Sequence, residues 1–257
     1  DQPLFDRNKN TPTLTKSGKT LLPVAYSILH QQTYFDQKVE SLAKNYEQDV
    51  VIAIDESISN HGILKIISPL AQQYPITNFE LISATTFDVE ELVKTGKAQI
   101  GIIYSDGELK VDMDFFLLGQ ARFLTIASPQ HALAKLNKVN SSDLKVHRQC
   151  AHRSLNQSEL WFSYAINAKV WYANTHQTLI DLVIQNVGWA LVPELAIKQQ
   201  LKQGDVVALP VVHEQGGWLT PVGCVVSRSK PAGPVTENLL TLLQQYFSNE
   251  DGWQAKA

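Results

Sequence analysis

The stretch VVIAI at residues 50–54 is followed directly by DESIS at residues 55–59. Five consecutive apolar residues, four of them β-branched, are typical of a strand that is buried on both faces of a parallel sheet. The polar residues that come next predict a turn at the carboxyl end of this strand. The sequence on either side is interpreted from this strand and turn outward.

The segments after the turn alternate between helical and strand patterns. Apolar residues at steps of three and four predict a helix through residues 63–74, which Pro75 ends. Residues 79–82 then predict a strand, residues 88–95 a helix, and residues 99–103 another strand. Such alternation indicates an α/β unit with a largely parallel sheet, in which the turns after successive strands meet at one edge. Ligands bind at this edge in open α/β sheets.

A second set of the same kind begins near residue 142. Two strand-like runs, at residues 115–119 and 123–127, precede it. From there on, strands are expected at 148–152, 169–172, 189–192, 206–209 and 222–227, and helices at 175–186, 194–201 and 233–247. Two α/β units of roughly one hundred residues each predict an α/β fold of two lobes with a cleft between them.

A long amphipathic helix is expected before the first strand, over residues 15–46. Helices with one narrow apolar seam usually pack on another helix, often from a second chain, and packing on the same domain is the alternative. Pro23 predicts a bend or a late start, because proline lacks a backbone N–H and its ring clashes with the preceding turn. The seam recurs at steps of three and four, at Leu22, Ala25, Leu29, Gln32, Phe35, Val39, Leu42 and Tyr46.

The composition indicates a folded globular chain. Of 257 residues, 44% are hydrophobic and 18% are charged, which supports a sizeable core and argues against disorder. The net charge of −3 argues against a predominantly nucleic-acid-binding surface. No signal peptide and no membrane span are recognisable, so a cytoplasmic location is expected. Cys150 and Cys224 give no disulfide framework; two reduced thiols are expected, with one bridge as the alternative.

The motifs that usually carry catalysis or cofactor binding are absent or incomplete. Residues 17–20 (SGKT) match the end of a phosphate-binding loop, but Thr13 occupies the position of its first glycine. The sequence contains no GxGxxG, GxSxG or HExxH. His147, Cys150 and His152 form an H-x-x-C-x-H pattern without a nearby fourth ligand, which is more simply interpreted as a strand with a buried thiol. No catalytic residue, metal or cofactor is therefore expected, and the protein is predicted not to be an enzyme.

Several segments of the sequence resemble LysR-type transcriptional regulators. Residues 4–22 contain LF, a basic residue and LTxxG, which resemble the last wing strand and the start of the linker helix in that family. Residues 92–102 are similar to its leucine–glycine–aspartate-leucine-alanine segment, with Gln99 in place of the aspartate. Residues 128–134 are similar to the histidine-proline-leucine-alanine segment at the lobe crossover, with alanine in place of the proline. Residues 182–193 resemble the glycine-then-proline segment of the second lobe.

The resemblance implies two Rossmann-like lobes of the periplasmic-binding-protein type, preceded by a long linker helix. The DNA-binding helix-turn-helix would precede Asp1, so DNA is expected to be contacted only through a part outside this chain. The expected division is a remnant of the wing at residues 1–14, the linker (dimerisation) helix at 15–46, lobe I at 47–124 and 226–257, and lobe II at 125–225.

The resemblance also implies that a small-molecule effector binds in the cleft, at the turns between strands and helices. The residues at those turns are Ser57, Ser59, Thr86, Ser128, Asn174 and Thr175. Hydroxyl and amide groups beside helix N-termini favour an anionic or carboxylate ligand, but the same residue types also serve as ordinary N-caps. Asp55 and Glu56 would repel a small anion. Together with groups at the other lip they leave a neutral, aromatic or cationic effector open: Trp171, Tyr172 and His176.

Effector binding is expected to shift the relative orientation of the lobes. The change would pass through the linker helices of a homodimer or homotetramer to the DNA-binding heads, with no membrane partner. A solute-binding protein of a transport system is the main alternative, since it has the same two lobes but would carry an export signal instead of a wing remnant. A small α/β enzyme is a second alternative, but the sequence shows no side chain with a reason to be reactive.

Overall fold

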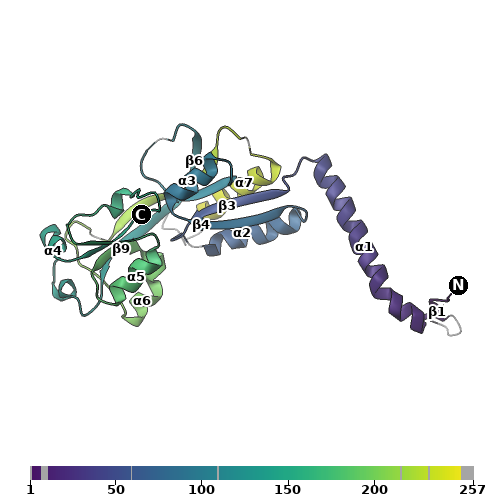
Figure 1. Ribbon diagram of the computed structural model, residues 1–257, viewed down its shortest axis with the longest axis horizontal. Helices are drawn as coiled ribbons and strands as arrows, with labels where there is room; N and C mark the ends of the chain where they lie inside the picture. Colours follow the sequence, from purple (N-terminus) through teal and green to yellow (C-terminus); the bar gives the residue numbers. More distant parts are fainter. Residues whose placement is uncertain are drawn as a thin grey trace.

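The computed structural model shows a two-lobed body at one end of a long projecting helix (Figure 1). It describes residues 2–6, 11–58, 60–108, 110–214, 216–230 and 232–249. The architecture confirms the expected α/β fold of two lobes preceded by a long helix. The described residues contain no helix that is long and apolar enough to cross a membrane.

The projecting helix α1 (Lys16–Ala43) begins where the sequence predicts it. Thr15 caps it, because its hydroxyl oxygen accepts a hydrogen bond from the backbone N–H of Gly18 at 3.0 Å. The helix runs through Pro23, so the expectation of a late start is wrong. Pro23 deprives the carbonyl of Lys19 of its helix partner, but Lys19 is exposed and water can take that place.

A short hairpin of β1 (Phe5–Asp6) and β2 (Thr13–Leu14) packs against the first turn of α1. The Leu4 carbonyl accepts a hydrogen bond from the Thr15 backbone at 3.0 Å. A Cβ atom on Gly18 would lie 2.2 Å from this carbonyl oxygen. The glycine of the LTxxG motif is therefore required by a close backbone contact.

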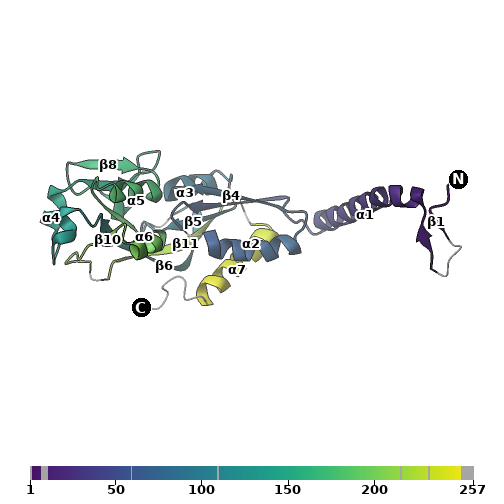
Figure 2. The same cartoon turned by 90° about the horizontal axis from the view of Figure 1, so that it is seen from below.

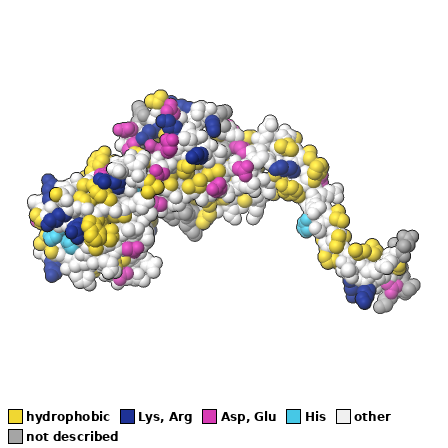
Figure 3. Space-filling model, in the orientation of Figure 1, with side chains coloured by type: hydrophobic (Ala, Val, Ile, Leu, Met, Phe, Trp, Pro, Cys, Tyr) yellow, Lys and Arg dark blue, Asp and Glu magenta, His cyan; other side chains and the backbone are white. Residues whose placement is uncertain are grey.

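The apolar seam of α1 is not packed against the rest of the chain. Within the described residues, Gly18 and Ser41 are the buried residues of this helix. The exposed fractions of the seam residues Leu29, Phe35 and Leu42 are 57%, 66% and 61%. Hydrophobic side chains accordingly line the projecting helix in Figure 3.

Three parallel strands form the sheet of the first lobe, in the order β4 (Asn78–Ala84), β3 (Asp49–Asp55), β5 (Ile100–Tyr104). Helix α2 (Asn60–Gln73) packs beside the last helix, α7 (Pro234–Asn249), on one face of this sheet, and α3 (Thr86–Lys94) covers the other (Figure 2). Alternate residues of β3 enter the two cores: Ile52 and Ile54 on the α2 side, Ala53 on the α3 side. This two-sided burial explains the continuous apolar run.

Two long antiparallel strands, β6 (Met113–Ala127) and β11 (Trp218–Ser227), run from the first lobe into the second. β11 pairs with β5 of the first lobe, and β6 pairs with β9 (Trp189–Pro193) of the second. The register between β6 and β11 shifts between Val222 and Gly223. The lobes are therefore joined by one hydrogen-bonded ribbon.

The strand β6 corrects the expectation of two separate runs at residues 115–119 and 123–127. Residues 120–122 between them also pair with β11, so the chain stays extended throughout. The polar side chains of Gln120 and Arg122, between the two runs, are only partly buried along the strand. Backbone pairing with β11 therefore keeps residues 120–122 in the strand although two of their side chains are polar.

The second lobe adds β7 (Gln149–His152) and β8 (Val170–Ala173) beside β9. The full strand order is β4-β3-β5-β11-β6-β9-β7-β8, and β10 (Val207–Ala208) pairs with β6. Because β7, β8 and β9 are antiparallel to β6, their carboxyl ends point back toward the first lobe. The helices and turns of this lobe are η1 (Ala132–Lys135), α4 (Ser141–Val146), η2 (Trp161–Ser163), α5 (His176–Ile184), η3 (Glu194–Ile197) and α6 (Lys198–Gln203).

Candidate functional site

The two lobes face each other with the carboxyl ends of their parallel strands. Asp55 ends β3, and Thr86 begins α3 directly after β4. Asn174 and Thr175 lie between β8 and α5. Because both sets of strand ends point toward the boundary between the lobes, the turns that follow them meet there.

Asp55 lies at the centre of a buried hydrogen-bond network in the first lobe. Its carboxylate accepts hydrogen bonds from the hydroxyl of Thr86 at 2.7 Å and from the hydroxyl of Ser57 at 2.9 Å. The Ser57 hydroxyl also lies 2.9 Å from the hydroxyl of Tyr104. Burial raises the pKa of Asp55, against the opposing effects of the neighbouring His176 and the Thr86 hydroxyl. The hydroxyl groups of Ser57 and Thr86 are thus engaged within the first lobe.

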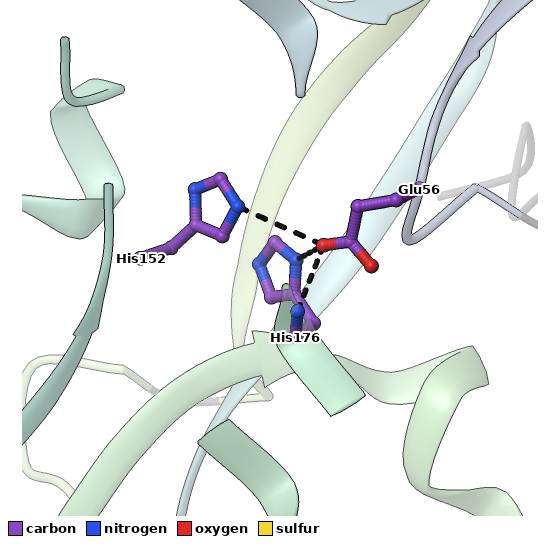
Figure 4. Close-up of side chains that lie close together, drawn as sticks. All are labelled: Glu56, His152 and His176. Carbon is purple, nitrogen blue, oxygen red and sulfur yellow. Dashed lines mark hydrogen bonds and ion pairs between the residues drawn. The ribbon is translucent and has the colours of Figure 1, made fainter. Parts of the chain in front are cut away.

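Glu56 reaches across the boundary between the lobes to the start of α5 (Figure 4). Its Oε1 accepts a hydrogen bond from the backbone N–H of His176 at 2.8 Å and lies 2.6 Å from Nδ1 of the same residue. The same oxygen lies 3.7 Å from Nε2 of His152, at the end of β7. The two imidazole rings stack with centroids 4.5 Å apart. These three residues are called the Glu–His–His cluster below.

The surroundings of the Glu–His–His cluster shift two of its pKa values. Burial has the largest effect on Glu56 and raises its pKa, but the hydrogen bonds and charge of His176 outweigh it, so the pKa is lowered. Burial lowers the pKa of His152 to about 4, and the adjacent His176 adds to the shift. At neutral pH, Glu56 is therefore ionised and His152 is neutral.

Aromatic side chains fill the middle of the boundary between the lobes. Tyr104 of β5 and Phe123 of β6 contact Phe162 of η2, with ring centroids 5.8 and 4.3 Å from it. All three side chains are buried. Phe123 also meets the His176 ring at 6.1 Å. These rings pack the two lobes against each other.

A cavity of about 440 Å³ opens beside Glu56, between α3 and the start of α5. Thr85 caps α3 without a side-chain bond to the helix backbone, because its hydroxyl donates to Asp88 instead. The first turn of α3 thus has no hydrogen bond from the side chain of its N-cap residue, and it carries the Asp88 carboxylate. The charged side chains in the cavity wall are three carboxylates and one ammonium group: Glu56, Asp88, Glu91 and Lys97.

Four of the six residues selected from the sequence lie at this boundary. Asn174 and Thr175 line the cavity. Ser57 and Thr86 lie behind it, in the network around Asp55. The four residues therefore lie at the boundary between the lobes, with Asn174 and Thr175 in the cavity wall and Ser57 and Thr86 behind it.

The other two residues are not part of this group. Ser128 follows β6, whose end pairs with the start of β9, so it lies at the opposite edge of the second lobe's sheet. It is fully buried, and its hydroxyl donates to Gln130 at 2.5 Å. Ser59 lies outside the described residues.

The sequence does not reveal the Glu–His–His cluster, because Glu56 and His176 are separated by 120 residues. The H-x-x-C-x-H pattern associates His152 with Cys150, but Cys150 is packed in the apolar core under α5. Cys150 and Cys224 are both free and buried, in different apolar cores. His152 lies at the end of β7, where it meets a residue of the other lobe.

Comparison with known proteins gives consistent results. A family model described as LysR substrate binding domain matches residues 44–248. The HTH-type transcriptional regulator AceR of Acinetobacter baumannii is 21% identical over 199 residues, which cover 76% of this chain and 66% of AceR. The matched part thus spans slightly less than two thirds of that relative.

Solved structures of low sequence identity share the fold. The effector binding domain of QuiR in complex with shikimate has a TM-score of 0.63 at 12% identity, covering 79% of this chain and 99% of that one. The regulatory domain of CcmR from Synechocystis PCC6803 in complex with 2-PG has a TM-score of 0.64 at 12% identity, covering 78% and 98%.

Proposed function

Because the chain belongs to the LysR family through a substrate binding domain that spans most of its length, we propose that it is the effector-sensing part of a LysR-type transcription regulator. The observation that carries this proposal is the cavity between the lobes, which α3 and the residues Asn174 and Thr175 enclose from opposite sides. A molecule bound there contacts both lobes, so its affinity depends on their relative orientation. Binding then shifts the population of orientations. We propose binding without chemical conversion, in the cytoplasm.

The effector we propose is a small polar metabolite with a carboxylate and a cationic or hydrogen-bond-donating group. The N-terminus of α5 already holds the carboxylate of Glu56 and the first turn of α3 carries Asp88, so the effector carboxylate is assigned to Lys97. Glu91 on the same wall suits a cationic group. The shikimate and 2-PG complexes of QuiR and CcmR support a small-molecule ligand in this fold.

We propose that α1, within the linker at residues 15–46, pairs with a second copy in a homodimer or homotetramer. The exposed seam supports this, because an apolar stripe along a projecting helix is stabilised by burial against another helix. The helix would transmit the change in lobe orientation to a DNA-binding head outside this chain, with residues 1–14 as the remnant of its wing.

The proposed lobe boundaries follow the pairing of the long strands. Phe123, just before the division that we propose between residues 124 and 125, is the last residue of β6 that pairs with β11 and the first that pairs with β9. We propose the return before Val222, where β11 begins to pair with β5, in place of residue 226. Lobe I then consists of residues 47–124 and 222–257.

The effector is tested by thermal unfolding of the full chain with amino acids, aromatic acids, dicarboxylates and sugar phosphates. A binder at one hundred times its dissociation constant stabilises the fold by about 2.7 kcal/mol, or roughly 5–10 °C for a chain of this size. Asn174→Ala is expected to abolish the rise. Ser128→Ala, at the far edge of the sheet, is the matched control and is expected to keep it. A rise that survives Asn174→Ala would place the ligand elsewhere, and a compound consumed on incubation would indicate an enzyme.

Pairing through α1 is tested by light scattering. The chain is expected to be at least dimeric at tens of micromolar, and Leu29→Glu is expected to dissociate it. Gln31→Glu, an exposed change off the seam, is the control. A monomeric chain with α1 intact would contradict the proposal.

A further inference from the structure

Two ring nitrogens of the Glu–His–His cluster have no hydrogen-bond partner among the described residues. They are the buried Nε2 of His152 and the buried Nε2 of His176. The His152 side chain is 6% exposed, so bulk water does not compensate. Nε2 of His152 points at the carboxylate oxygen Oε1 of Glu56, 3.7 Å away (Figure 4).

Glu56 and the two histidines lie in a nearly closed place, since the Glu56 side chain is 15% exposed and those of His152 and His176 are 6% and 3% exposed. Among the described residues, the ion pairs of Glu56 are with His152 and His176 and with no lysine or arginine. The cluster therefore brings one carboxylate and two imidazoles together with buried ring nitrogens whose hydrogen-bonding capacity is unused.

We propose that Glu56, His152 and His176 bind a divalent transition-metal ion, with Zn²⁺ as the first choice, at the boundary between the lobes. One ligand atom from each residue lies within 4.8 Å of the others. Around Zn²⁺, with bonds of about 2.0–2.2 Å, neighbouring ligand atoms lie about 3.3 Å apart, so side-chain adjustments on the order of 1 Å suffice. Two imidazoles and one carboxylate are the ligand set of zinc sites that keep a fourth position open.

The access route fits a metal site. Glu56 lines the cavity of about 440 Å³, through which the ion enters and from which water or a bound molecule supplies the fourth ligand. Since Glu56 belongs to the first lobe and both histidines to the second, the ion joins the lobes.

The test starts with the full chain stripped of metal by EDTA and dialysed. Titration with Zn²⁺ by calorimetry is expected to give one ion per chain, and a midpoint of unfolding raised by roughly 5–10 °C at one hundred times the dissociation constant. Co²⁺ in place of Zn²⁺ is expected to give visible absorption of a nitrogen- and oxygen-ligated ion without a thiolate band. His152→Gln and Glu56→Gln are each expected to weaken Zn²⁺ binding by on the order of 100-fold or more, beyond the 10–100-fold cost of losing a second-shell group.

His147→Gln is the matched control, because it removes the other histidine of the H-x-x-C-x-H pattern and leaves the cluster intact. It is expected to bind Zn²⁺ as the unchanged chain does. Circular dichroism of each variant in EDTA confirms that it is folded before the affinities are compared. Equal Zn²⁺ affinity in all variants would overturn the proposal as adventitious binding. A thiolate band that Cys150→Ser removes would overturn it in favour of a different site.

The proposal is independent of the proposed effector. Zn²⁺ binding with no metabolite response, or a metabolite response with no Zn²⁺ binding, would separate the two. A complete absence of Zn²⁺ and Co²⁺ binding overturns the metal site and leaves the thermal shift with metabolites unaffected.

Discussion

Replacing Glu56 by glutamine removes one negative charge from the contact between the lobes while keeping the shape of the side chain. Glu56 Oε1 accepts a hydrogen bond of 2.8 Å from the His176 backbone and lies 2.6 Å from Nδ1 of the same residue. A hydrogen bond to a charged group contributes about 1.5–3 kcal/mol and a neutral one about 0.5–1.5 kcal/mol. Two bonds that each lose about 1–1.5 kcal/mol lower the free energy of unfolding by about 2–3 kcal/mol. The Glu56 side chain is 15% exposed, so solvent screening reduces this only slightly.

The assay is thermal and urea unfolding at neutral pH with EDTA present, which excludes any contribution from bound metal. The expected loss corresponds to a midpoint lower by roughly 5–10 °C. Glu91→Gln is the matched control, because Glu91 lines the same cavity wall but is exposed. Its effect is expected to stay within about 0.5 kcal/mol. If Glu56→Gln unfolds at the same midpoint as Glu91→Gln, the charged contact between the lobes does not stabilise the fold and the reasoning is refuted.

Three further predictions concern other parts of the chain. The pKa of His152 is about 4 in the folded chain against 6.5 as its ordinary value, so the unfolded state binds the proton first as the pH falls. The free energy of unfolding should therefore decrease by about 2 kcal/mol between pH 6.5 and 5 in EDTA, and His152→Gln should flatten this slope in urea titrations. Burial raises the pKa of Cys150 to about 11 and that of Cys224 further, so neither thiol should react with Ellman's reagent until the chain unfolds; rapid reaction of the native protein would contradict this. A Cβ on Gly188 would lie 2.3 Å from the Arg148 carbonyl oxygen, so Gly188→Ala should lower stability by about 1–3 kcal/mol, and an unchanged thermal midpoint would count against the contact.

Local patterns predict the elements of this chain well because each pattern reflects burial along one segment. The run at residues 50–54 is apolar throughout because α2 and α3 cover opposite faces of β3. Thr15 and Gly18 mark the start of α1 because their roles depend on neighbours a few residues away. Asn174 and Thr175 can be placed after a strand and at the start of a helix for the same reason.

The remaining features depend on distant pairing, which periodicity does not encode. Ser128 follows a strand as Ser57 does, but β6 runs antiparallel to β9, which places Ser128 at the opposite edge of the sheet. The contact of Glu56 with His176 joins segments 120 residues apart, and neither segment alone indicates it. The direction of one strand therefore decides which of several similar turns belong to the site.

The ribbon of β6 and β11 restricts how the lobes move relative to one another. Both passages of the chain between the lobes lie in this ribbon, and its ladder of hydrogen bonds prevents the two strands from sliding past each other. What remains is twisting and bending, and resistance to both is lowest where the ladder is irregular, between Val222 and Gly223. The lobes therefore rotate relative to one another most easily by twisting the ribbon at this point. A small change of angle at Gly223 moves the far end of each lobe by a larger distance.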